Sequence, residues 1–272
     1  MKIQLIAMDL DGTALRKDRD TFSPRLLRAL EEAHSRGVGI VPVTGRQFGL
    51  LPTALKEAHP WREHVILCNG GQIRGFSSSA ALLDLRIPPQ ALRELLALAA
   101  DCELPIEFSL DSKLYLTRES LERQLPWEEL AFHRDTILAN HSRIVPSLDA
   151  WCVSGVEKVN LLCIPWELRE TVEKRLEAVA VSAVWTSPTG MEITHRDATK
   201  DRGLAFLCRQ LDIPMSEVMA LGDSGNDITM LRAAGWGVAM GNAPDAVKAA
   251  ADACTESYDA DGAAKAIERY VL

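Results

Sequence analysis

The chain has 272 residues, enough for two domains, and 47% apolar and 25% charged residues, as in an ordinary globular protein. Its formal net charge of -8 argues against a nucleic-acid partner, which would require a basic face. Six scattered cysteines without zinc-type spacing, no apolar run long enough to span a bilayer and no signal-peptide pattern predict a cytoplasmic protein without a membrane partner.

The first part of the chain alternates apolar strands with amphipathic helices. Ser23-Pro24 is a helix start, with a capping residue followed by proline at the first helical position. Strands that alternate with helices imply right-handed crossovers and a parallel sheet. The elements expected here are strands over 3–8, 38–43 and 64–68 and helices over 24–35 and 47–59.

The pattern changes after Asn69-Gly70-Gly71 and returns at Gly190. Two short extended pieces, 72–76 and 81–86, are expected to form a hairpin or flap. Residues 87–188 mix strands and helices without the earlier alternation and predict an inserted α+β cap domain. Helices and strands then alternate again to the C-terminus. We therefore expect an α/β protein whose core, residues 1–86 and 189–272, is a doubly wound, Rossmann-like parallel sheet.

Two aspartates follow the first strand directly. Asp9 and Asp11 are two residues apart, so in continuing strand geometry their side chains leave on the same face. Two carboxylates about 4 Å apart repel by roughly 4 kcal/mol at an effective dielectric constant near 20. A hard divalent cation relieves this repulsion, and Mg²⁺ is usually held by a few carboxylates together with substrate phosphate. Gly12 allows the backbone to turn sharply here.

Three further polar segments follow predicted strands or begin helices, at the edge where open α/β sheets bind ligands. Thr44-Gly45-Arg46 offers a hydroxyl and backbone N–H groups at a helix start that could hold a phosphate, although taken alone it is better explained by plain helix capping. Lys200 begins a helix after the insertion. Gly222 to Asp227 places two carboxylates, two glycines and an asparagine directly after a buried strand. Together with Asp9 and Asp11, these segments predict one shared site.

The order of these segments resembles the four motifs of the haloacid dehalogenase (HAD) superfamily. The motifs are D-x-D-G-T at 9–13, T-G-R at 44–46, the lysine at 200 and G-D-x-x-N-D at 222–227. The tail through Asn242-Ala243-Pro244 is similar to the Cof-type phosphatase branch, which carries a large C2-type cap at the place of the insertion. One departure is the Asp201-Arg202-Gly203 that follows the lysine, where the branch more often has Lys-Gly.

This resemblance implies an aspartyl-phosphate mechanism. Asp9 would be the nucleophile, and Asp11 would protonate the leaving oxygen and later activate water. Mg²⁺ would be held by Asp9, the Asp11 backbone carbonyl, Asp223 and, through water, Asp227. The phosphate or substrate ligands implied are Thr44, the Gly45 amide, Arg46, Asn69, Lys200 and Asn226.

The expected protein is a Mg²⁺-dependent phosphatase, a hydrolase of phosphoric monoesters. Its substrate would be a small phosphorylated metabolite such as a sugar phosphate, over which the cap would close, and the chain would act as a monomer or homodimer. Two alternatives remain open from the sequence. One is a phosphotransferase or mutase of the same superfamily, and the other is a non-enzymatic phosphate-binding regulatory module.

Overall fold

The computed structural model describes residues 2–78, 80–131, 133–138 and 141–272, and the chain forms two compact units. The first unit comprises residues 1–46, 51–83 and 199–272, and the second comprises 47–50 and 84–198. The second unit is wider than the insertion expected at 87–188. It extends to Ala198 because β11 (Gly190–His195) pairs with β9 and β10 of its own sheet.

The first unit contains a five-stranded sheet in the order β14-β13-β12-β1-β2, in which all neighbours are parallel. Such strands are buried on both faces and therefore consist almost wholly of apolar residues. β1 lies between strands from opposite ends of the chain. The bounds are β1 Leu5–Met8, β2 Gly39–Pro42, β12 Val218–Gly222, β13 Trp236–Ala239 and β14 Ala253–Cys254.

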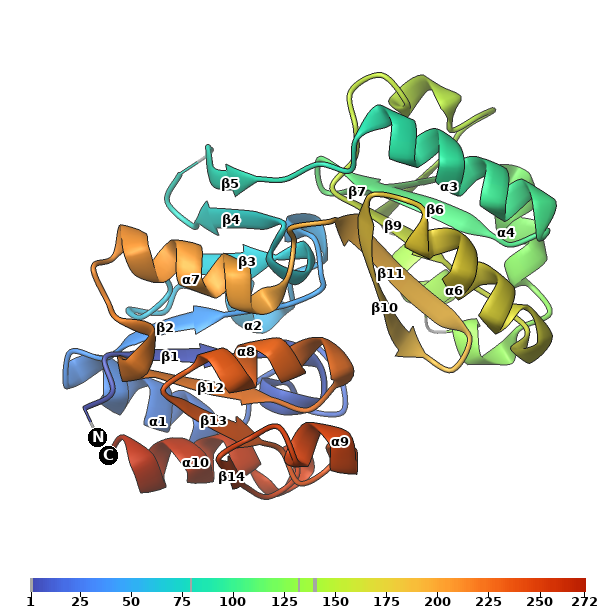
Figure 1. Ribbon diagram of the computed structural model, residues 1–272. Helices are drawn as coiled ribbons and strands as arrows, with labels where there is room; N and C mark the ends of the chain where they lie inside the picture. Colours follow the sequence, from blue (N-terminus) through green and yellow to red (C-terminus); the bar gives the residue numbers. More distant parts are fainter. Residues whose placement is uncertain (1, 79, 132, 139–140) are drawn as a thin grey trace. The chain divides into compact units, whose positions relative to one another are not determined.

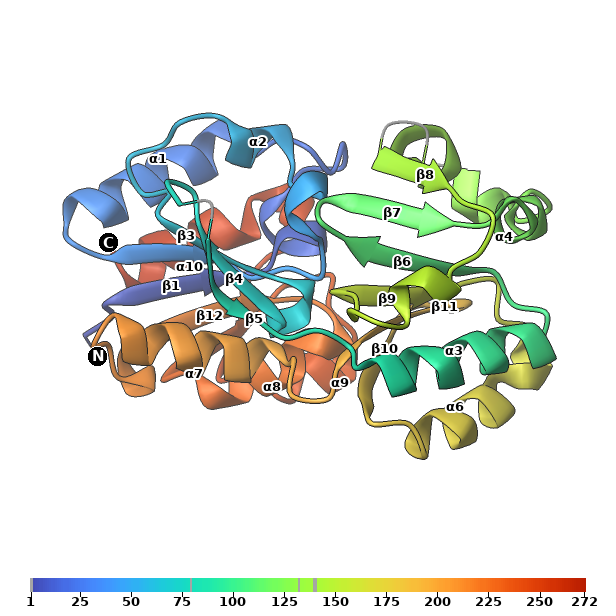
Figure 2. The same ribbon diagram turned by 90° about the horizontal axis from the view of Figure 1, so that it is seen from above.

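Helices cover both faces of this sheet, as Figures 1 and 2 show, which makes it doubly wound. One face carries α1 and α10, which contact each other, and the opposite face carries α7 and α8. The expected fold class, an α/β core with a parallel sheet, is confirmed. The bounds are α1 Pro24–Ser35, α7 Lys200–Gln210, α8 Ile228–Ala233, α9 Asp245–Lys248 and α10 Gly262–Tyr270.

α1 begins at the Ser23-Pro24 signal, as the sequence predicted, whereas the prediction of one helix over 47–59 is wrong. The Ser23 Oγ accepts a hydrogen bond from the Leu26 N–H at 3.0 Å, which caps α1. Between residues 47 and 59 the chain forms only a single turn at Phe48–Leu50 and the short α2 (Thr53–Lys56). Pro52 separates them, because proline cannot donate the backbone hydrogen bond that a continuous helix needs.

A smaller three-stranded sheet, in the order β3-β4-β5, extends this unit. β3 (His64–Leu67) was expected as a third parallel strand, but it pairs antiparallel with β4 (Gln72–Gly75). One bridge, Val43 to Ile66, joins it to the end of β2 in the parallel sense. β4 and β5 (Ala81–Asp84) form the flap expected over 72–86.

The second unit is an α+β structure around a six-stranded sheet in the order β10-β11-β9-β6-β7-β8. α3 and α6 cover one face, visible in Figure 2, and their apolar side chains form a core with β6, β9 and β11. The strands are β6 Ile106–Leu110, β7 Lys113–Leu116, β8 Ser142–Ile144, β9 Lys158–Leu161 and β10 Val181–Ser187, and the helices are α3 Pro89–Asp101, α4 Arg118–Gln124 and α6 Arg169–Glu177.

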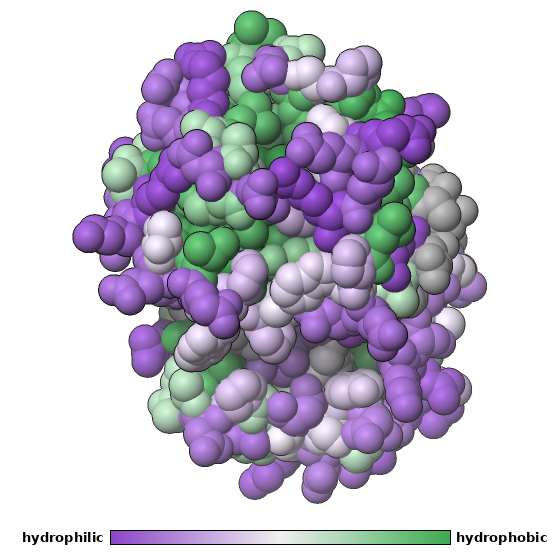
Figure 3. All heavy atoms as spheres, turned by 90° about the vertical axis from the view of Figure 1, so that its right-hand side faces the viewer, coloured by the Kyte–Doolittle hydropathy of each residue, from purple (hydrophilic) through white to green (hydrophobic). Residues whose placement is uncertain are grey.

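The surface and the cysteines agree with the composition. Hydrophilic side chains predominate on the face shown in Figure 3, and hydrophobic ones gather in separate patches. None of the six cysteines forms a disulfide, and five are buried or half-buried. Among the described residues, no helix is long and apolar enough to cross a membrane.

Candidate active site

Two aspartates meet at the carboxyl edge of the parallel sheet because β1 and β12 are neighbours. Asp9 follows β1 and Asp223 follows β12, and the Asp9 N–H donates to the Leu221 carbonyl at 2.9 Å. Asp227 lies one turn further along the same loop. Carboxylate oxygens of Asp9, Asp223 and Asp227 lie within 4.8 Å of one another. Residues more than 200 positions apart in the chain thus form one acidic cluster.

Glycines allow this close approach. Gly12 has a φ of 80°, and a Cβ at this position would lie 2.3 Å from Asp223 Oδ2. At Gly222, a Cβ would lie 2.5 Å from the Asp227 Cβ. Both positions therefore exclude any side chain, and each does so directly beside a carboxylate of the cluster.

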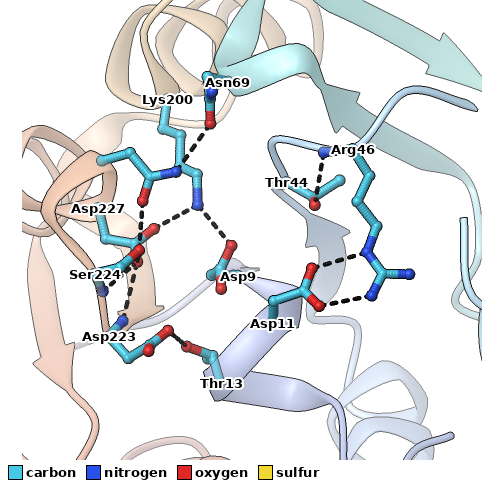
Figure 4. A network of polar contacts seen from close by, with 11 residues as sticks. Asp9, Asp11, Thr13, Thr44, Arg46, Asn69, Lys200, Asp223, Ser224 and Asp227 are labelled. Atoms are coloured by element: carbon cyan, nitrogen blue, oxygen red, sulfur yellow. Dashed lines mark hydrogen bonds and ion pairs between the residues drawn. The ribbon is translucent and has the colours of Figure 1, made fainter. Parts of the chain in front are cut away.

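Lys200, the first residue of α7, is buried among these carboxylates (Figure 4). Its Nζ lies 2.6 Å from Asp9 Oδ1 and 2.6 Å from Asp227 Oδ1. The start of α7 is held in place by a close backbone contact, since a Cβ at Gly70 would lie 2.1 Å from the Thr199 carbonyl oxygen. The predicted convergence of the lysine with Asp9 and Asp223 is therefore present in the structure.

The cluster has too little positive charge of its own. Burial, and then repulsion by Asp227 and Asp223, raise the pKa of Asp9 well above its usual value, although Lys200 opposes this. Burial and repulsion by Asp227 likewise raise the pKa of Asp223 to about 6. Burial alone would lower the pKa of Lys200, but Asp227 and Asp9 outweigh it and raise that pKa. Three carboxylates and one ammonium leave two uncompensated negative charges, which one divalent cation balances.

Asp227 also organises the loop that carries it. Its Oδ2 accepts hydrogen bonds from the backbone N–H groups of Asp223 and Ser224, each at 2.9 Å. The Ser224 Oγ donates to Asn226 Oδ1 at 2.6 Å, and Asn226 Nδ2 donates to Asn69 Oδ1 at 2.9 Å. Asn69, at a φ of 55°, follows β3. Two amides expected as substrate ligands therefore bond to each other at the edge of the acidic cluster.

Asp11 and Arg46 form an ion pair apart from this cluster, as Figure 4 shows. Arg46 donates from Nε to Asp11 Oδ2 at 2.8 Å and from Nη2 to Asp11 Oδ1 at 2.6 Å. The Asp11 side chain thus faces Arg46 and is not among the carboxylates that surround Lys200. The Arg46 N–H donates to Thr44 Oγ1 at 3.1 Å, with Gly45 between them in the loop after β2.

Two contacts to the cluster involve residues to which the sequence gave no role. The buried Thr13 Oγ1 donates to Asp223 Oδ1 at 2.9 Å. Asn242 Nδ2 donates to Asp223 Oδ2 at 3.2 Å. Both residues belong to segments that carried the family resemblance, D-x-D-G-T and Asn242-Ala243-Pro244, and this was the available signal.

The chain combines a doubly wound core, which carries acidic and basic groups at its carboxyl edge, with an inserted α+β unit. The family model of haloacid dehalogenase-like hydrolases matches residues 6–267. The chain therefore belongs to the haloacid dehalogenase-like hydrolase family, in its Cof-type branch, and is a hydrolase of the phosphatase class, as the resemblance predicted.

The names of similar proteins and structures support this family assignment. The putative phosphatase YxeH of Bacillus subtilis (strain 168) is 31% identical over 273 residues, which cover 99% of this chain and 98% of the relative. The 5-amino-6-(5-phospho-D-ribitylamino)uracil phosphatase YcsE of the same strain is 30% identical over 281 residues, covering 99% and 96%. The solved structure of the HAD subclass IIB sugar phosphatase BT4131 is 25% identical, with a TM-score of 0.83, and covers 98% of each chain.

Proposed function

We propose that this protein is a Mg²⁺-dependent phosphatase that hydrolyses small phosphomonoesters through an aspartyl-phosphate on Asp9. The observation that carries the proposal is the packing of Asp9 with Asp223, Asp227 and the buried Lys200. Phosphoryl transfer needs mainly positioning and neutralisation of charge. A nucleophilic carboxylate between a lysine and a cation site supplies both.

The acidic cluster fits Mg²⁺ by its donor chemistry. Its ligands are hard carboxylate oxygens, and their mutual repulsion favours a bound dication. Asp9, Asp223 and the Asp11 backbone carbonyl would hold the ion, with Asp227 acting through water. When bound, Mg²⁺ would neutralise charge on the phosphoryl oxygens and help to orient the phosphate.

Asp9 would carry the covalent step. Lys200 holds its Oδ1, which leaves Oδ2 to attack phosphorus. In this step an Asp9 Oδ2–P bond forms, the bond from phosphorus to the substrate oxygen breaks, and that oxygen takes a proton from Asp11. Water then attacks the same phosphorus, Asp11 accepts its proton, and Asp9 is released with inorganic phosphate.

The ion pair with Arg46 restricts when Asp11 can act. Both oxygens of the Asp11 carboxylate accept hydrogen bonds from Arg46, and the proposed reaction requires one of them to reach the substrate oxygen. At least one of these hydrogen bonds therefore opens in the proposed reaction before the substrate oxygen is protonated. Arg46 would then be available to contact the substrate, which is the role expected from the resemblance.

The groups beside the cluster would hold the rest of the phosphate. Thr44 Oγ1 and the Gly45 amide lie in the loop after β2, the neighbour of β1. Asn226 and Asn69 form a bonded pair of amides, which would present their remaining polar atoms to the substrate in a fixed orientation. Lys200 would also screen the negative phosphate from Asp9 and Asp227.

The second unit would act as the cap that selects the substrate, and we propose a sugar phosphate or the phosphate of a related polyol. Support comes from the names of relatives, one a sugar phosphatase and another a phosphatase of a phosphoribityl compound. A mutase or other phosphotransferase of the same superfamily would use the same four motifs, so the products must distinguish them.

The test is release of inorganic phosphate from a panel of sugar, polyol and aromatic phosphomonoesters, with Mg²⁺ or with EDTA. We expect Mg²⁺-dependent release, fastest for a sugar or polyol phosphate, and an acid-stable, base-labile phosphate adduct in rapid-quench samples. Isomerised sugar phosphate without free phosphate would identify a mutase instead. Equal rates in EDTA would contradict the metal assignment.

A further inference from the structure

Asn242 connects three separate segments of the first unit. It lies between β13 and α9, and its Nδ2 donates to the Gly12 carbonyl at 3.0 Å and to Asp223 Oδ2 at 3.2 Å. Its Oδ1 accepts from the Tyr258 N–H at 3.2 Å. A single amide thus uses both its donor and its acceptor atoms to tie the loops after β1 and β12 to the segment before α10.

Thr13 holds the other oxygen of the same carboxylate. Its Oγ1 donates to Asp223 Oδ1, while Asn242 donates to Oδ2, so each oxygen of Asp223 has its own side-chain donor. Two donors on the two oxygens fix the rotation of the carboxylate about its Cβ–Cγ bond. Each oxygen keeps a lone pair, because a carboxylate offers about four acceptor positions.

The charge of these donors matters as much as their position. Asp11 is held by a cationic guanidinium, which neutralises it, whereas Asp223 is held by a hydroxyl and an amide, which do not. A carboxylate oriented by neutral donors keeps its full charge for a cation. Asn242 also fixes the Gly12 carbonyl, in the loop whose Asp11 carbonyl is a proposed ligand.

We propose that Thr13 and Asn242 are positioning residues that orient Asp223 for Mg²⁺ and so set the affinity of the metal site. The inference rests on the proposed function, because it assumes that Asp223 binds the metal. Hydrogen-bond partners of metal ligands typically contribute 10- to 100-fold to metal affinity. Asn242 is exposed and lies outside the hydrophobic core of the first unit. A role in metal binding can therefore be distinguished from a role in folding alone.

The experiment is Mg²⁺ binding to the full chain by titration calorimetry, without substrate. Thr13→Val removes the hydroxyl and keeps the shape, and Asn242→Ala removes the amide. We expect each to weaken Mg²⁺ binding by about 10-fold or more, and kcat at saturating Mg²⁺ to change less than the metal affinity does. Thr13→Ser keeps the hydroxyl and should bind Mg²⁺ nearly as tightly as the wild type.

Ser23→Ala is the matched control for stability. It removes one hydroxyl hydrogen bond of the same unit at the start of α1, so it should lower the unfolding temperature in EDTA and leave Mg²⁺ affinity unchanged. If Thr13→Val and Asn242→Ala unfold earlier in EDTA but bind Mg²⁺ like the wild type, the inference is overturned and the proposed function stands. If the wild type itself binds no Mg²⁺, both this inference and the proposed Mg²⁺-dependent function are contradicted.

Discussion

Each unit buries an acidic side chain, Asp9 in the first and Glu107 in the second, but the two carboxylates have opposite surroundings. Glu107, on β6 of the second unit, accepts hydrogen bonds from Gln124 at 2.9 Å, from His133 at 3.0 Å and from Asn160 at 3.2 Å. Burial alone would raise the pKa of Glu107, but these partners, His133 above all, lower it. Asp9 accepts a side-chain hydrogen bond from Lys200, but its burial and the two neighbouring carboxylates raise its pKa.

This difference in surroundings distinguishes a buried carboxylate with a structural role from one suited to a reaction. A buried carboxylate surrounded by donors is satisfied and stabilises its fold. A buried carboxylate crowded by others costs folding energy, and the site that tolerates this cost gains affinity for a cation and a reactive oxygen. Burial of an acid alone does not indicate a site, whereas the identity of its neighbours does.

The largest expected effect is on activity. Asp9→Asn should lower phosphate release by at least about 1,000-fold, because the amide cannot attack phosphorus. The same change removes one of the crowded charges, so the unfolding temperature in EDTA should rise or stay unchanged. Phosphate release and circular dichroism measure the two effects. Wild-type turnover in this variant would rule out Asp9 as the nucleophile.

The corresponding change in the second unit should affect stability. Glu107→Ala leaves the buried groups of Gln124 and Asn160 and the ring of His133 without their acceptor, so we expect a loss of about 4 kcal/mol. Urea unfolding followed by circular dichroism measures this loss. Glu107→Gln keeps the volume and is the matched control, with a smaller expected loss. Equal stability of Glu107→Ala and the wild type would refute the comparison.

Asp223 of the first unit and Glu107 of the second predict opposite responses to pH. The pKa of Asp223 is raised from 3.8 to about 6, so the folded state without metal binds the proton more tightly than the unfolded chain. Its contribution to stability is present below pH 3.8 and is lost as pH rises through about 6, by up to about 3 kcal/mol. The pKa of Glu107 is lowered from 4.5, so its contribution is present above pH 4.5 and is lost as pH falls through the lowered pKa.

Urea titrations in EDTA at several pH values measure this response. For the wild type we expect stability to fall between pH 4.5 and pH 7, and Mg²⁺ to restore it mainly at the higher pH, where the carboxylates are charged. Asp223→Asn should flatten this part of the curve, and Glu107→Gln should not. A wild-type curve that rises throughout this range would contradict the assignment.

The smallest expected effect concerns Arg46. Arg46→Met removes the ion pair with Asp11 and the contact to the substrate that we propose for Arg46, and it should lower kcat about 10-fold because the substrate is then less well positioned. Arg36→Met is the control, since Arg36 pairs with Glu32 at 2.5 Å on the exposed surface of α1, where such pairs contribute little. Equal kcat in Arg46→Met and the wild type would show that the ion pair has no part in catalysis.

Local patterns were enough to predict much of the fold. The segments before Asp9 and from Val218 are continuous apolar runs, as buried strands are, and they alternate with helices along the chain. This alternation predicted the parallel sheet. The error at 47–59 came from extending one helix across Pro52, because proline disrupts a helix when it stands in the interior. The assignment of 190–195 to the core failed for a different reason. A strand does not encode locally which of two sheets it joins, and here pairing with β9 and β10 decided it.

For the site, the sequence predicted which residues gather but not how they pair. The spacing of Asp9 and Asp11 suggested two carboxylates on one face. Instead, the Asp11 carboxylate pairs with Arg46, which lies 35 positions further along the chain. Such a pairing depends on the loops after β1 and β2 lying side by side. The catalytic and ligand roles of these residues stay predictions until the variants above are measured.

The order of the central strands has a consequence for biosynthesis. β1 lies between β2 and β12, and β12 begins only at Val218. On the ribosome, β1 and β2 emerge early, but one edge of β1 has no partner until most of the polypeptide has been made. Exposed apolar edges are prone to aggregation, so we expect the nascent chain to need rapid completion or a chaperone. Asp9 meets Lys200 and Asp223 only at that late stage, and an incomplete chain therefore lacks the proposed active site.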